Sequence, residues 1–186
     1  MLENIFSISL GYFLGSVPFS FIVAKLKGVD LKEKVKNGQI GATAVKRNCG
    51  LFPAILAGSG DFSKGALAIF LAKKITKSDW IMVLSGLAAI VGHNWSIFLK
   101  FLGGKGGAVS LGEVLYLSTY PFLYSLYLIP IFLLIKKEKI FGLKKTTLFH
   151  FLGFVSISIF GFLFDYPFPI SISPILFFTP IILKKN

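Results

Sequence analysis

Long apolar runs recur along the whole chain and constrain its fold more than any other feature. Most of them hold about 20 residues, enough for a helix to cross the hydrocarbon core of a bilayer. The composition agrees, because 54% hydrophobic residues and a mean hydropathy of +0.77 are too apolar for a soluble domain of this size. We therefore expect an all-α, polytopic membrane protein with a single membrane-embedded domain over residues 1–186. The runs cover residues 5–24, 51–72, 80–98, 108–135, 146–164 and 167–183.

The run 108–135 is too long for one crossing and contains the sequence STYPF at Ser118–Phe122. Pro121 disfavours helical geometry at the residue before it, so we divide the run there and count seven spans. With the N-terminus outside, 16 of the 20 lysines and arginines then fall in segments that face the cytoplasm, as the positive-inside rule requires. Six spans would separate the basic residues of 136–145 from those of 25–50. We expect seven transmembrane helices, an outside N-terminus and a cytoplasmic C-terminus.

The net charge of +12 has the same explanation. In a membrane protein such an excess is typical of positively charged cytoplasmic loops, so we expect no nucleic-acid partner. The first apolar run follows the sequence MLEN, which has no basic residue, and this favours an anchor helix over a signal peptide.

Two glycine-rich segments fall on the predicted cytoplasmic face, Asn37–Gly50 and Gly103–Gly107. Bare backbone N–H groups beside a cation suit a phosphate. Arg47 is the only arginine, and a guanidinium binds phosphate through two parallel hydrogen bonds. Lys105 lies among glycines, although Gly106 after it excludes a P-loop pattern. These residues indicate a phosphate site under hydrophobic helices, as in an enzyme that joins a soluble phosphate compound to a lipid chain; the plainer interpretation is a helix-connecting turn and a chance arginine.

Charged residues inside the predicted spans have two interpretations. Asp61 and Lys64 are three positions apart on one helix face, and charges at that depth normally pair or line a polar cavity. They either form an ion pair that ties helices together or act beside an active site, and Glu113 is equally ambiguous. His93 has no second His, Cys or carboxylate at ligand spacing, so we expect no metal site.

Four segments together resemble the bacterial glycerol-3-phosphate acyltransferases that use acyl phosphate. They occur in the same order and span about the first 112 residues. The segments are GSVPFSFIVAKLKGVDL (Gly15–Leu31), GATAVKR (Gly41–Arg47), DFSKG (Asp61–Gly65) and GHNWSIFLKFLGGKGG (Gly92–Gly107).

The resemblance implies a multi-pass enzyme of the bacterial inner membrane whose active site faces the cytoplasm. Such an enzyme transfers a fatty acyl group from acyl phosphate to the 1-hydroxyl of glycerol 3-phosphate, which gives lysophosphatidic acid. Its partners would be these two substrates and membrane lipids, and it would need no metal or cofactor. Lys105 and Arg47 would be catalytic and hold substrate phosphates, while His93 would support the loop architecture. The residues that the resemblance assigns to substrate binding are Asn37, Gly38, Gly41, Ala42, Thr43, His93, Gly103, Gly104 and Gly106.

Three positions of the first phosphate loop depart from the family pattern Ser-Gly-Asn-(Ile/Val)-Gly-Ala-Thr-Asn. Asn37, Gln39 and Ala44 stand where that pattern has Ser, Asn and Asn. An alternative interpretation is therefore a diverged paralogue, non-catalytic or of altered specificity, that binds a lipid phosphate.

Overall fold

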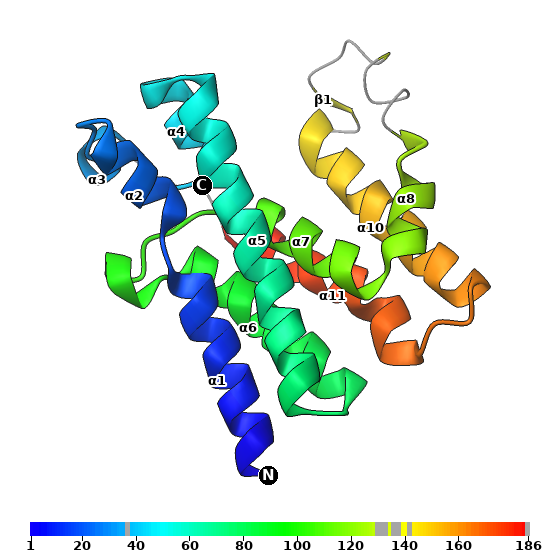
Figure 1. Ribbon diagram of the computed structural model, residues 1–186. Helices are drawn as coiled ribbons and strands as arrows, with labels where there is room; N and C mark the ends of the chain where they lie inside the picture. The colour runs from blue at the N-terminus through cyan, green and yellow to red at the C-terminus, as the bar shows by residue number, and fades with distance from the viewer. Residues whose placement is uncertain (36–37, 129–133, 135–138, 141–142, 185–186) are drawn as a thin grey trace.

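The computed structural model describes residues 1–35, 38–128, 134, 139–140 and 143–184, and helices make up most of it (Figure 1). A two-residue antiparallel ribbon, β1 (Lys139–Ile140) with β2 (Leu143–Lys144), precedes α10. The helices are α1 (Leu2–Ser16), α2 (Phe19–Leu26), α3 (Leu31–Lys34), α4 (Ala42–Cys49), α5 (Leu51–Ile75), α6 (Asp79–Asn94), the 3₁₀ helix η1 (Ile97–Leu99), α7 (Gly107–Leu117), α8 (Thr119–Ser125), α10 (Lys145–Leu163) and α11 (Phe168–Leu183).

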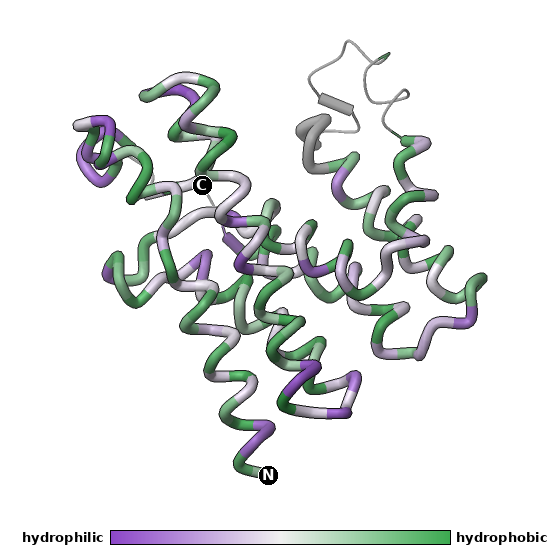
Figure 2. Tube along the Cα trace, in the orientation of Figure 1, coloured by the Kyte–Doolittle hydropathy of each residue, from purple (hydrophilic) through white to green (hydrophobic). Residues whose placement is uncertain are grey.

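Within the described residues, three segments are long and apolar enough to cross a membrane: Leu2–Leu26, Leu51–Ile75 and Asp79–Leu99. Shorter apolar helices follow at Gly107–Leu117, Leu148–Leu163 and Phe168–Leu183. Figure 2 shows a largely apolar trace. Its hydrophilic residues lie mainly near the ends of helices, and two such regions are α3 and the turn between α5 and α6. The helical, membrane-type fold expected from the sequence is confirmed, while the number of spans and their direction stay predictions.

Close backbone contact joins α1 to α6. Gly11 and Gly15 form a GxxxG pattern, and a Cβ atom at either position would overlap the α6 backbone at Ser85 or Ala89. Small residues at this spacing let membrane helices approach closely. A hydrogen bond of 2.9 Å between the buried hydroxyls of Ser7 and Ser85 completes the contact. This seam fixes the first helix against the helix that carries His93.

The predicted division of the run 108–135 is confirmed. Helix α7 ends at Leu117 and α8 begins at Thr119, so the break falls at Ser118. Pro121 lies in the first turn of α8, where a missing N–H costs no helical hydrogen bond. Residues 129–133 and 135 of this run lie outside the described residues.

Two features of the N-terminal third differ from the sequence expectation. The run 5–24 is not one uninterrupted helix, because α1 ends at Ser16 and α2 begins at Phe19, after Pro18. The segment 25–50 is not a plain loop, because it contains α3 and α4, so Arg47 lies in the last turn of a helix. Buried side chains of this segment, among them Leu31, Ile40 and Val45, pack on the first turns of α5 and on Leu99. Packing of apolar side chains explains why this region folds.

Candidate functional site

The two glycine-rich segments lie side by side, although about sixty residues of sequence separate them. The Ile40 N–H donates to the Gly103 carbonyl at 3.0 Å, and Gln39 pairs with Gly103 in an isolated parallel bridge. A Cβ atom added at Gly41 would lie 3.7 Å from the Gly104 Cα. The expectation that these segments share one face is confirmed, and they are in direct contact.

The segment 103–106 rests on the end of α6. The Gly104 N–H donates to the His93 carbonyl at 3.1 Å. A Cβ atom at Gly103 would overlap the carbonyls of His93 and Asn94, and one at Gly104 would overlap the His93 imidazole. Gly106 has a φ of +82° and precedes α7, a conformation that favours glycine. Glycines are therefore required here, and they hold the half-buried Lys105 between them.

The first segment leads into α4. Gly38 has a φ of +64°, and Gly41 is the residue that precedes the helix. Ala42 and the exposed Thr43 form the first helical turn, so they stand beside the contact between the segments. Asn37 lies outside the described residues.

Arg47 is exposed, one turn and a half further along α4. Among the described residues, His93, Gly103 and Gly104 come together with the first segment, whereas the backbone hydrogen bonds and close approaches between the two segments do not include Arg47. Within the same described part of the chain, no three His, Cys, Asp or Glu side chains gather as a metal site would require.

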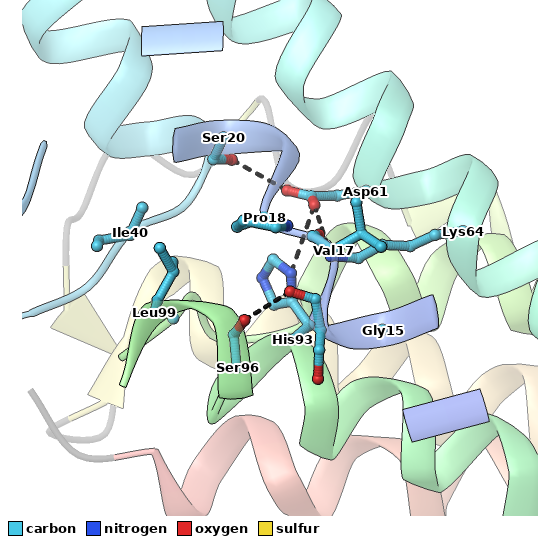
Figure 3. A pocket seen from close by; sticks show the side chains of 12 residues that line it. Gly15, Val17, Pro18, Ser20, Ile40, Asp61, Lys64, His93, Ser96 and Leu99 are labelled. Atoms are coloured by element: carbon cyan, nitrogen blue, oxygen red, sulfur yellow. Dashed lines mark hydrogen bonds and ion pairs between the residues drawn. The ribbon is translucent and has the colours of Figure 1, made fainter. Parts of the chain in front are cut away.

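A buried polar cluster adjoins the two segments, and Figure 3 shows its side chains. Asp61 and Lys64 are 1% and 3% exposed and form an ion pair of 3.0 Å, so the predicted pairing is confirmed. Lys64 Nζ also donates to the Val17 carbonyl at 2.7 Å, and the Ser20 hydroxyl donates to Asp61 Oδ2 at 3.0 Å. His93 Nδ1 lies 3.4 Å from Asp61 Oδ1. The cluster thus joins α5, α6 and the break between α1 and α2.

A small cavity of about 10 Å³ adjoins this cluster, with room for about one water molecule. Asp61, Lys64 and His93 line it together with Ile40 and Gly103 from the two glycine-rich segments. Asp61 and Lys64 therefore form an ion pair and also line a polar cavity. Their role beside an active site stays a prediction.

Ser20 and the Val17 carbonyl were not identified from the sequence as part of the site, although Pro18 between them is a signal for both. A proline inside an apolar run ends or bends a helix and exposes backbone groups. Here the break leaves the Val17 carbonyl in reach of Lys64 and starts α2 so that Ser20 meets Asp61.

Asn94 was also missed, and it connects the glycine-rich segment to the last helix. Its side chain is fully buried and donates from Nδ2 to the Pro180 carbonyl at 2.8 Å. The backbone carbonyl of Asn94 accepts a hydrogen bond from Lys184 Nζ, and the same ammonium lies 5.0 Å from the centre of the Trp95 ring. Burial lowers the pKa of Lys184. The end of α11 therefore packs beside the candidate site.

Comparison with known proteins gives the family. A family model described as glycerol-3-phosphate acyltransferase matches residues 5–185, which is nearly the whole chain. The chain belongs to the glycerol-3-phosphate acyltransferase family. The resemblance drawn from the sequence motifs is thus confirmed.

Individual members of the glycerol-3-phosphate acyltransferase family are moderately similar. The protein of that name from Thermosipho melanesiensis is 46% identical over 120 residues, which is 64% of this chain and 58% of the relative. The one from Thermus thermophilus is 43% identical over 118 residues, 63% of this chain and 59% of the relative. This chain therefore matches less than two thirds of the length of these curated relatives.

Solved structures extend the likeness over almost the whole chain. A crystal structure of PlsY (YgiH), an integral membrane glycerol 3-phosphate acyltransferase in its glycerol 3-phosphate form, gives a TM-score of 0.80 at 34% identity. The match covers 97% of this chain and 87% of that one. The lysophosphatidic acid form of the same enzyme gives a TM-score of 0.78 at 31% identity. Together with the apolar helices, this likeness shows a membrane protein.

Proposed function

We propose that this protein transfers a fatty acyl group from acyl phosphate to glycerol 3-phosphate and so forms lysophosphatidic acid. The observation that carries the proposal is the contact between the two glycine-rich segments through Ile40 and Gly103. It gathers backbone N–H groups, the start of α4 and Lys105 at one place. Family membership and the solved relatives, which are known in a glycerol 3-phosphate form and a lysophosphatidic acid form, support the same reaction.

In this proposal the two cations hold substrate phosphates. Lys105 contributes a charge within the glycine-rich segment, and Arg47 contributes a guanidinium from α4. The backbone at Gly38, Gly41, Gly103, Gly104 and Gly106 gives the phosphates room to approach, as nests of N–H groups do in other phosphate sites. The first turn of α4, with Ala42 and Thr43, adds N–H groups at a helix N-terminus. Asn37 would complete the first segment, and His93 supports the second.

The chemistry suits such a site because an acyl phosphate is already activated. The 1-hydroxyl oxygen of glycerol 3-phosphate attacks the acyl carbon, and a new ester bond forms. The bond from that carbon to the phosphate oxygen breaks, and inorganic phosphate leaves with its electron pair. A phosphate oxygen of the acceptor or of the donor takes the hydroxyl proton. Cations and N–H groups that stabilise the developing charge, and the joint positioning of both substrates, supply the catalysis.

We further propose that the chain crosses the bacterial inner membrane seven times with the site facing the cytoplasm. The positive-inside distribution of lysines supports this direction. Acyl phosphate and the lysophospholipid product would enter and leave through the apolar surroundings, and glycerol 3-phosphate through the aqueous face.

An acyl-transfer assay on the purified protein in lipid tests the proposal. Radiolabelled glycerol 3-phosphate is offered with palmitoyl phosphate, and with palmitoyl-CoA as the control donor. We expect product from palmitoyl phosphate alone. A folded protein that gives no product beside an active family member would contradict the proposal and favour the alternative, a paralogue that only binds a lipid phosphate.

Lys105→Ala should lower kcat/KM about a hundredfold or more, the range seen when one charge-stabilising donor is lost. Lys73→Ala is the matched control, since Lys73 is an exposed lysine at the far end of α5. Equal rates for the two variants would exclude Lys105 from the site.

A further inference from the structure

The cluster of Asp61, Lys64 and His93 has no step in the proposed reaction, yet its three ionisable side chains are all buried. Asp61 and Lys64 come from α5 and His93 from α6, and their exposed fractions are 1%, 3% and 8%. Buried charges are costly, and a chain retains them where they pair or perform a task. The position of His93 between Asp61 and the glycine-rich segment indicates the task.

The His93 ring has a different neighbour at each edge. Nδ1 lies 3.4 Å from Asp61 Oδ1. On the opposite edge, a Cβ atom added at Gly104 would meet Nε2 before any other atom. The main chain of His93 holds the same residue, because its carbonyl accepts the Gly104 N–H at 3.1 Å. The ring therefore fills the space between the Asp61 carboxylate and the backbone that precedes Lys105.

We propose that Asp61 is a positioning residue, which holds His93 with its protonated Nδ1 toward the carboxylate so that the opposite edge supports the backbone of Gly103–Gly106. A neutral imidazole carries one N–H, and the carboxylate beside Nδ1 selects the tautomer that bears it there. The orientation of the ring then determines how closely the Gly104 backbone approaches α6, and this in turn determines the position of Lys105. The functional part of this inference rests on the proposed phosphate site.

Lys64 has a separate role, which decides how the test must be built. Its ammonium forms an ion pair with Asp61 and donates to the Val17 carbonyl. Replacing Asp61 alone would leave Lys64 without its ion-pair partner inside the membrane domain. A loss of activity would then reflect misfolding as readily as a displaced histidine. The double variant Asp61→Leu/Lys64→Met removes both charges and the carboxylate acceptor at nearly constant shape and avoids this ambiguity.

Kinetics of the double variant give the first readout. With palmitoyl phosphate as donor, we expect kcat/KM to fall about tenfold to a hundredfold, as a misplacement of about 1 Å produces, mainly through a higher KM for glycerol 3-phosphate. Ser85→Ala is the matched control, because it removes a buried polar contact of α6 on the side of α1, at Ser7. Wild-type kinetics in the double variant would overturn the proposal and confine Asp61 to pairing with Lys64.

The tautomer of His93 gives the second readout, and a merely structural role would not change it. The chain has only two histidines, so a His150→Gln variant leaves His93 as the single source of imidazole ¹⁵N signals. We expect Nδ1 to carry the proton in otherwise wild-type protein and Nε2 to carry it in the double variant. An Nε2–H tautomer with Asp61 in place would overturn the proposal. An inactive wild-type protein would refute the proposed reaction, whereas these spectra would still decide whether Asp61 sets the orientation of His93.

Discussion

Gly104 and Gly107 are three residues apart and differ in the space around them. A Cβ atom at Gly104 would overlap the His93 imidazole, whereas nothing lies within 4 Å of one at Gly107. The difference arises because Gly104 packs on the end of α6 and Gly107 already begins α7. At the scale of the residue, the proposed site would depend on missing side chains as much as on Lys105 and Arg47.

Gly104→Ala should therefore displace the segment that holds Lys105 and lower kcat/KM by about a hundredfold, in line with a displacement of about 1 Å. Gly107→Ala, in the same sequence motif, should stay within a few-fold of wild type. Steady-state kinetics with palmitoyl phosphate compare the two. Similar losses in both variants would show that the contact with His93 does not set the loop.

The helices show which interactions a sequence reveals. Apolar runs predict helices well, since every backbone group in a bilayer must bond within its own segment. The break at Ser118 was readable from Pro121, and the break before Phe19 was equally readable from Pro18. The contact of His93 with Asp61 could not be read from the sequence, because helices that are apolar on several sides do not reveal which of their faces meet. The pairing of Gln39 with Gly103 was also hidden, because backbone pairing between distant segments has no local sequence pattern.

The seam between α1 and α6 yields a prediction about stability. Gly15→Ala would place a methyl group against the α6 backbone at Ala89, and overpacking of this kind costs about 1–3 kcal/mol. The matched control is Gly153→Ala in α10, where a Cβ atom has nothing within 4 Å. Thermal unfolding in detergent should show a lower midpoint for Gly15→Ala alone. An unchanged midpoint would mean that α1 and α6 can move apart to accommodate the methyl group without a loss of stability.

At the scale of the whole molecule, charge decides which way the chain crosses the bilayer. The lysines at the end of α5 and the start of the next turn stand apart from those around the candidate site. Lys77 is on the predicted outside and Lys100 on the predicted inside, and both are exposed. The proposed direction of the protein depends on this separation.

Cysteine labelling tests that direction. In a Cys49→Ser background, a membrane-impermeant maleimide added to intact cells should label Lys77→Cys and leave Lys100→Cys unlabelled. Both should react after the cells are permeabilised, which controls for accessibility. The reverse pattern in intact cells would refute the proposed orientation and place the site on the wrong side for a cytoplasmic substrate.

The bonds between Asn94 and the end of α11 also bear on how the protein is made. Residues 93–106 leave the ribosome well before residues 180–184, so the side-chain amide and backbone carbonyl of Asn94 can form these hydrogen bonds only after a much later part of the chain has been synthesised. The glycine-rich segment can form its contact with residues 38–41 earlier, but its support is incomplete until α11 has inserted. A nascent chain stalled before α11 would therefore be inserted in the membrane without a finished site, and translation of α11 would be the event that completes it.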